Sequence, residues 1–114
     1  SIRYSVRIPR CYHLSFNIRV IDSFENHVVF MTLSGDFGWL RAEYVNDEFR
    51  LVDNYGNCIS VFNYCKEGDI LGIYIQQTQS SRIFKVTNVA KNKESVMEAD
   101  LPPLGEFTEM RLEP

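Results

Sequence analysis

Hydrophobic and polar residues alternate with a period of two along most of this chain. At the start, the apolar side chains at the even positions 2–8 are interrupted by Arg3, Ser5 and Arg7. Such alternation is typical of a half-buried strand, and Pro9 should end it because proline cannot donate a ladder hydrogen bond. β-Branched and aromatic runs predict six further strands, at 17–21, 27–33, 39–45, 49–52, 70–75 and 82–89.

Turn-forming residues separate these runs. Asn46-Asp47 predicts the tip of a hairpin, and the segment 53–57 predicts a loop in which Asp53 bonds backbone amides. Gly68-Asp69 predicts a second such turn. We also expect two short helices, one at 10–16 after Pro9 and one at 58–64. The fold class predicted is mostly β: a seven-stranded open or closed antiparallel pseudobarrel with two short helices.

The sequence indicates one main domain and a tail. Nine basic and nine acidic residues balance over 1–90, whereas 91–114 holds three basic and six acidic residues. Alternation fades in this second segment, which includes Pro102-Pro103. We predict a pseudobarrel over 1–90 and an acidic tail or linker over 91–114. The best candidates for core aromatic residues are Phe30, Trp39, Phe49, Phe62 and Phe84.

Composition narrows the class of protein. Hydrophobic residues make up 45% of the 114 residues and charged residues 24%, as in ordinary globular domains. No run of about 18 apolar residues predicts a membrane-spanning helix. The sequence has neither a signal peptide nor an initiator Met, so we expect it to begin inside a longer protein or after processing.

Chemistry-bearing residues are few. Three cysteines, Cys11, Cys58 and Cys65, are an odd number and suggest reduced, buried thiols in a cytosolic or nuclear compartment. Their spacing to His13 and His27 matches no zinc pattern, so we predict no metal and no cofactor. No nucleophile is paired with a base in a recognisable motif. The sequence therefore predicts neither an enzyme nor a small-molecule substrate.

Three stretches carry a resemblance to a known family. Val6-Arg7-Ile8-Pro9-Arg10 is a strand ending in an Ile-Pro-basic step. Gly35 to Trp39 is a glycine turn followed by the Trp that begins a strand. The region from Cys58 to Ile75 predicts a short helix, a Gly-Asp turn and an apolar strand. Phe84-Lys85-Val86 would close the domain. In this order the chain resembles the plant B-three DNA-binding domain, in its divergent reproductive-meristem and vernalization-like branch.

The resemblance implies a DNA-binding domain of a plant transcriptional regulator in the nucleus, gripping the major groove of double-stranded DNA with two arms. Arg3, Arg7 and Arg10 would contact phosphates, which set register without reading sequence. On the Trp-led hairpin, Arg41, Asn46 and Arg50 would face base edges. Glu43, Asp47 and Glu48 lie on the same hairpin and would repel phosphate.

Two other functions fit the same sequence. A near-neutral pseudobarrel could act as a protein-interaction module with little DNA binding. The DNA-recognition module of a bacterial restriction enzyme, where a similar barrel is known, is the third reading. A basic face over both arms would favour DNA, whereas an apolar patch of several hundred Å2 would favour a protein partner.

Overall fold

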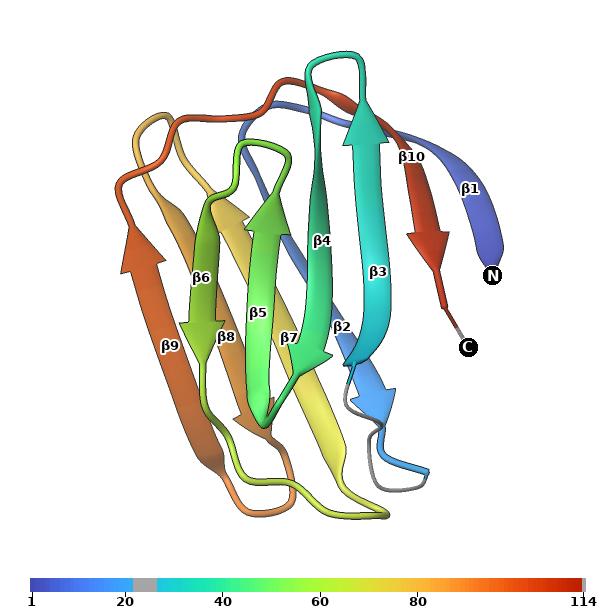
Figure 1. Cartoon of the computed structure of the whole chain (residues 1–114), viewed down its shortest axis with the longest axis vertical. Helices are drawn as coiled ribbons and strands as arrows, with labels where there is room; N and C mark the ends of the chain where they lie inside the picture. The colour runs from blue at the N-terminus through green and yellow to red at the C-terminus, as the bar shows by residue number, and fades with distance from the viewer. Residues whose placement is uncertain (22–26, 114) are drawn as a thin grey trace.

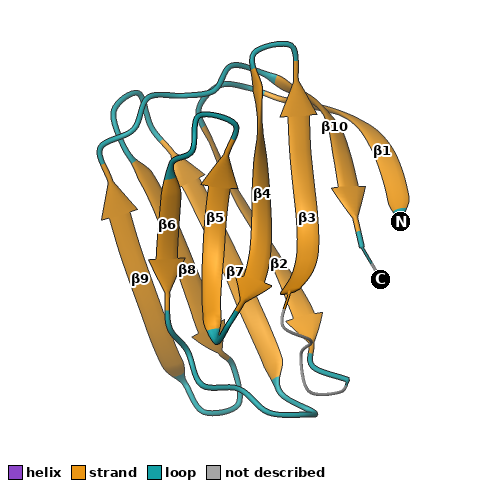
Figure 2. Cartoon of the chain, in the orientation of Figure 1, coloured by secondary structure: helices purple, strands orange, loops and turns teal. Residues whose placement is uncertain are grey.

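Two antiparallel β-sheets packed face to face form the protein (Figures 1 and 2). The structure, a computed structural model, describes residues 1–21 and 27–113. The larger sheet has six strands in the order β1-β10-β3-β4-β5-β6, and the smaller has four in the order β2-β7-β8-β9. The chain is thus a β-sandwich, the usual way for two sheets that are each apolar on one face to bury those faces.

The strands of the larger sheet are β1 (Ile2–Ile8), β3 (His27–Gly35), β4 (Gly38–Val45), β5 (Glu48–Asp53), β6 (Cys58–Val61) and β10 (Phe107–Leu112). Those of the smaller sheet are β2 (Tyr12–Arg19), β7 (Ile70–Gln77), β8 (Arg82–Asn88) and β9 (Lys93–Ala99). Nowhere in the described ranges does a helix long and apolar enough to cross a membrane occur.

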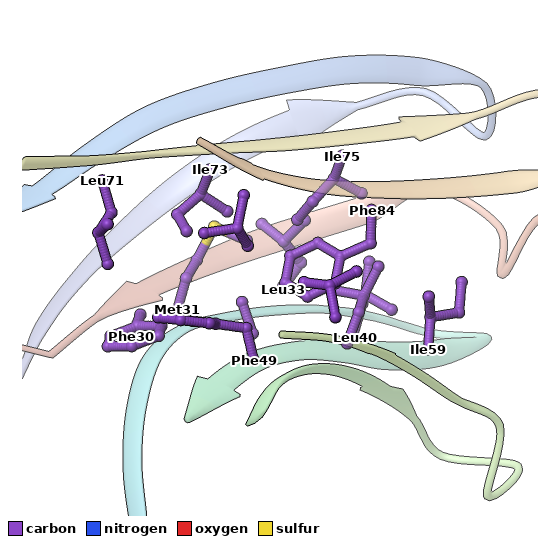
Figure 3. Packing of buried hydrophobic residues seen from close by; sticks show 14 of the residues in the cluster. Phe30, Met31, Leu33, Leu40, Phe49, Ile59, Leu71, Ile73, Ile75 and Phe84 are labelled. Atoms are coloured by element: carbon purple, nitrogen blue, oxygen red, sulfur yellow. The ribbon is translucent and has the colours of Figure 1, made fainter. Parts of the chain in front are cut away.

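The core fills the space between the sheets (Figure 3). Alternate residues of each strand point inward, so that Phe49 from β5 and Ile73 and Ile75 from β7 extend into the core from opposite sheets. Phe84 is 1% exposed and is the register partner of Ile75 on the neighbouring strand. The period-two pattern therefore predicted the buried faces correctly for most strands.

The predicted barrel and both predicted helices are wrong. The two sheets have free edge strands and do not close, and the described residues contain no helix. Residues 12–16 belong to β2, because Leu14 and Phe16 alternate inward opposite Ile75 and Ile73 of β7. Cys58–Val61 is strand β6, which pairs with β5. In both segments partner strands complete the hydrogen bonding, which outweighs local helix signals.

The expectation of a separate tail fails for residues 93–112. β9 pairs with β8, and β10 lies between β1 and β3 inside the larger sheet. Leu104 and Phe107, which the sequence left outside the domain, are 8% and 0% exposed. The alternation of apolar and polar residues was weak here because β9 is an edge strand with one solvated face. In addition, residues 100–106, which connect β9 of one sheet to β10 of the other, have no regular secondary structure.

Two of the five predicted core aromatic residues lie elsewhere. Phe30, Phe49 and Phe84 are buried as predicted, but Phe62 is 65% exposed. Trp39 is only partly buried, on the outer face of the larger sheet, where the Arg41 guanidinium lies 5.0 Å from its ring centroid. The predicted inward position of Trp39 is wrong because Leu40, not Trp39, is the inward residue of β4.

Candidate functional site

Connections from both sheets meet at one end of the sandwich, the upper end in Figure 1. The β3–β4 turn, the β5–β6 turn and the long β9–β10 connection all lie there. Between them is a groove of about 540 Å3, which we call the end groove. It is lined by Arg10, Phe37, Tyr55, Gln79, Pro102, Pro103, Leu104 and Gly105. A smaller recess of about 320 Å3, which shares Tyr55 and Pro102–Leu104, extends toward Asp53 and Arg82.

Two aromatic rings stand exposed at the end groove. Phe37, in the β3–β4 turn, is 70% exposed, and Tyr55, in the β5–β6 turn, is 71% exposed. The Tyr55 hydroxyl donates to the Phe37 carbonyl oxygen at 3.5 Å, which places the two turns side by side. Exposed aromatic side chains that line a groove together form a candidate interaction surface.

The β5–β6 turn is held from its base by Asp53. One carboxylate oxygen of Asp53 accepts from the backbone N–H of Tyr55 at 2.8 Å and of Asn57 at 3.0 Å. Gly56 has a φ of +84°, which favours glycine at that position. The prediction that Asp53 bonds backbone amides in a loop is confirmed, and Tyr55 is consequently fixed at the edge of the groove.

Behind the groove, a buried ion pair joins the two sheets. Arg82 of β8 and Asp53 of β5 have side chains that are 1% and 0% exposed, and their Nη1 and Oδ2 atoms are 2.9 Å apart. Arg82 Nε also donates to Gln77 Oε1 at 2.8 Å. A buried pair of this kind is stable only when its remaining donors and acceptors are also satisfied, as they are here.

The same network holds the proline-containing wall of the groove. Arg82 Nη2 donates to the carbonyl oxygen of Pro102 at 3.2 Å, and Gln77 Nε2 donates to that of Leu101 at 3.0 Å. Gly105 follows with a φ of +86°, and a Cβ there would lie 2.8 Å from the Phe37 ring. The groove is therefore preorganised: its wall is tied to the core and its aromatic rim packs on a glycine.

Charge at the end groove is limited to one cation. Arg10 Nη2 donates to Gln79 Oε1 at 2.9 Å, and both side chains are exposed lining residues. None of the other residues lining the end groove is ionised at neutral pH. The surface thus combines an aromatic and proline platform with a guanidinium that can bind a carboxylate.

The ionisable groups behind the groove are structural. Burial opposes ionisation of Asp53, but hydrogen bonds from Arg82, Asn57 and backbone amides outweigh it and hold the pKa of this carboxyl below its usual range. Burial raises the pKa of Tyr12 to about 12, so its hydroxyl stays protonated. Because both carboxylate oxygens of Asp53 already accept hydrogen bonds, this residue is poorly placed to act as a general base.

The residues predicted to contact DNA lie in four separate places. Arg10 lines the end groove, whereas Arg3 and Arg7 are exposed on edge strand β1. Asn46 is exposed in the β4–β5 turn, at the opposite end of the molecule from the groove (Figure 1). The hairpin itself is confirmed, with Asn46 and Asp47 at φ of 49° and 72° in its two-residue turn.

Arg41 and Arg50 lie on the outer face of the larger sheet. As predicted, Arg41 shares that face with Trp39 and Glu43, and its Nε lies 3.1 Å from Glu43 Oε2. Arg50 Nη2 lies 3.0 Å from Glu48 Oε2. Both guanidinium groups therefore already have an acidic partner on this face, which lowers its net positive charge.

Sequence analysis missed the network of Asp53, Gln77 and Arg82, although the pattern contains a signal for it. Each of the three is in phase with the inward residues of its strand: Asp53 with Leu51, Gln77 with Ile75, and Arg82 with Phe84. Polar residues at the ends of three inward rows indicate a buried polar cluster. The three cysteines are free, but none is fully buried as predicted: Cys58 is exposed, and Cys11 and Cys65 are half-buried. No group of three or more possible metal ligands is found over residues 1–21 and 27–113.

Comparison with known proteins identifies the fold. The sequence matches no protein-family model and no curated protein. The LG1-3 region of the laminin alpha2 chain has a TM-score of 0.75 and 11% identity over 95% of this chain. Scytalido-glutamic peptidase with a peptide-based transition state analog has a TM-score of 0.60 and 10% identity over 95% of this chain.

A third similar structure is the enzymatically active domain of bacteriophage CBA120 tailspike protein 2, with a TM-score of 0.63 and 10% identity over 94% of this chain. The chain spans 23%, 61% and 20% of these three proteins. At such identities the likeness shows a shared sandwich fold alone. None of the three is a B-three domain, and that resemblance stays a prediction.

Proposed function

We propose that this chain is a non-catalytic recognition module that binds a segment of another polypeptide in the end groove. The observation that carries the proposal is the pair of exposed rings, Phe37 and Tyr55, beside the Pro102–Gly105 wall. The groove volume of about 540 Å3 lies within the range of ligand sites. Aromatic side chains in such positions supply much of the binding energy at protein interfaces.

The rigidity of the groove supports the same function. The buried donors of Arg82 and Gln77 hold Pro102 and Leu101, so the wall need not be ordered when a ligand binds. A preformed wall lowers the entropic cost of association. Arg10 defines the chemistry of the ligand further: an apolar or aromatic side chain on the two rings, with a carboxylate nearby for the guanidinium.

Structures of this fold show that a polypeptide ligand is compatible with it. The printed description of one glutamic peptidase, SCP-B, places it in a complex with the tripeptide Ala-Ile-His; its TM-score is 0.54 at 10% identity over 95% of this chain. That likeness concerns the fold, and the groove itself supports the proposal. DNA binding, a plant nuclear regulator and the absence of enzymatic activity all stay predictions.

Peptide selection followed by mapping tests the proposal. The chain is used to select peptides from a random library, and the amide resonances of the labelled protein are followed on addition of a selected peptide. We expect shifts at 36–38, 54–57 and 102–106. We also expect a change in the fluorescence of Trp39, whose backbone N–H donates to Asn54 Oδ1 of the β5–β6 turn at 2.9 Å. Peptides that shift only the β4–β5 turn, or a duplex DNA that binds where no peptide does, would contradict it.

A further inference from the structure

Strand β1 forms a free edge of the larger sheet, away from the end groove. It pairs with β10 on one side only, and the sheet order places no strand on its other side. Every residue from Ile2 to Ser5 is exposed. An edge of this kind leaves a row of backbone N–H and C=O groups to which another strand can add.

The inner face of this edge is only partly covered. Ile2 and Tyr4 are opposite Leu112 and Met110, which pack against the core, yet Ile2 is 55% exposed and Tyr4 45%. These side chains stay exposed because the six-stranded sheet is wider than the four-stranded one, so that β1 and β10 extend past its edge (Figure 1). A strand added beside β1 would cover both side chains.

The outer face of the same edge is basic. Strands β1 and β10 together carry three arginines, Arg3, Arg7 and Arg111, against one acid, Glu109. Arg3 is directly opposite Arg111, and like charges in that position are destabilising. Glu109 lies 3.9 Å from Arg111, and none of the ion pairs between described residues includes Arg3 or Arg7.

We propose that β1 is a strand-addition site for an acidic, extended segment of a partner polypeptide. Apolar side chains of that segment would lie against Ile2 and Tyr4, and acidic side chains at alternate positions would face Arg3 and Arg7. The period of two in the partner follows from the pleat of a strand. Its acidic residues would supply a partner for Arg3 and Arg7, since the one acid of β10, Glu109, lies 3.9 Å from Arg111 instead.

A second copy of this chain is a poorer occupant of the edge. In a symmetric antiparallel pairing centred on Ser5, Arg3 of one copy would be opposite Arg7 of the other. Such a contact would add like charges to an edge that is already basic. Charge complementarity therefore favours an acidic partner segment over self-association.

The test uses the full chain and a capped octapeptide of alternating Glu and Val, with an otherwise identical Lys-Val peptide as its control. Hydrogen exchange is measured for the amides of 2–5 that point away from β10. We expect the Glu-Val peptide to slow their exchange and to bind at least about tenfold more tightly than the Lys-Val peptide. Arg3→Glu should weaken the Glu-Val peptide about tenfold and strengthen the Lys-Val peptide, a reversal that misfolding cannot produce.

Two further variants separate this site from others. Arg19→Glu changes an exposed arginine on the edge strand of the smaller sheet and should leave binding unchanged, as should Phe37→Ser in the end groove. Equal binding of the two peptides, protection at β2 or β9 instead of β1, or no binding would overturn the proposal. Binding of duplex DNA in place of the Glu-Val peptide, or dimerisation through β1 in sedimentation, would also overturn it.

Discussion

Arg82 is the residue on which both the sandwich and the end groove depend. It is buried and makes hydrogen bonds to Asp53, Gln77 and the Pro102 carbonyl, so one guanidinium joins the two sheets and the groove wall. Guanidinium suits this role because its donors diverge in a fixed plane and it stays charged when buried. Lysine at this position would reach one acceptor and leave the others without a donor.

Removing one partner of this pair should destabilise the fold strongly. We expect Arg82→Met to lower the free energy of unfolding by about 3–5 kcal/mol, because Asp53 would remain as a buried charge. Urea denaturation measures this loss. Arg50, which is partly exposed and paired with the partly exposed Glu48, provides the control, and Arg50→Met should cost under about 1 kcal/mol. Equal losses of unfolding free energy in the two variants would contradict a special structural role for the buried Arg82–Asp53 pair.

Asp53 should also make stability depend on acid. Its pKa is lower in the folded protein than in the unfolded chain, so its contribution is complete above the unfolded value near pH 4 and is lost as pH falls through the folded value. We expect Asp53→Asn to lower stability at pH 7 and to flatten its decline below pH 4. Asp69, whose pKa is also lowered, should leave part of the decline. Thermal melts of the parent and of Asp53→Asn between about pH 2 and pH 7 measure the pH dependence of stability. Parallel declines of the two proteins would contradict a contribution from Asp53.

Two glycines with nearly the same backbone conformation allow the Phe37 contact to be isolated. Gly105 and Gly56 have φ of +86° and +84°, but a Cβ on Gly105 would meet the Phe37 ring, whereas one on Gly56 meets nothing within 4 Å. Both alanine variants should cost about 1–2 kcal/mol of stability from backbone strain. Only Gly105→Ala should additionally weaken peptide binding in the end groove. Titration of both variants with one peptide measures this difference in affinity. Equal affinities would show that the contact with Gly105 does not position Phe37.

At the scale of elements, the β9–β10 region completes the domain. β10 lies between β1 and β3, and Phe107 contacts Tyr12 of the opposite sheet with ring centroids 5.9 Å apart. We therefore expect Phe107→Ala to cost about 3–5 kcal/mol, and a chain ending at Asn92 to remain unfolded. Chemical denaturation and circular dichroism measure these effects. An unchanged melting temperature of the truncated chain would instead support the prediction that 91–114 is a separate tail.

Sequence patterns predicted most strands because burial in a sandwich imposes alternation residue by residue. The Asn46-Asp47 hairpin and the amide bonds of Asp53 followed from local turn chemistry. The helices at 10–16 and 58–64 were wrong because those segments receive their hydrogen bonds from β7 and β5, which are distant in sequence. Edge strand β9 was missed because one of its faces is solvated.

The end groove could not be predicted in the same way. Its rings at 37 and 55 and its wall at 102–105 come together only through the order of strands in the two sheets. Arg10 was singled out by sequence, but as a phosphate contact. Gln77 and Arg82 carried a usable signal, because they are in phase with buried residues, whereas nothing local marks Phe37 as a groove residue.

At the scale of the whole molecule, the two proposed binding sites lie on surfaces of different chemistry. The end groove is aromatic and nearly neutral, and the β1 edge is basic and offers free backbone groups. Outer-face arginines 41 and 50 are paired with acids, which removes the continuous basic face that duplex DNA would need. This distribution of charge is the basis on which we propose polypeptide partners.

The affinity of a library-selected peptide for two double variants tests the central claim most directly. Phe37→Ser/Tyr55→Ser removes both rings of the end groove, and Phe62→Ser/Tyr64→Ser removes two rings exposed to a similar extent, 65% and 64%, outside it. We predict that the first variant binds roughly 10–100-fold more weakly by calorimetry, with an unchanged melting temperature, and that the second binds like the parent. Equal affinities for both variants and the parent would contradict a recognition site at this end of the sandwich.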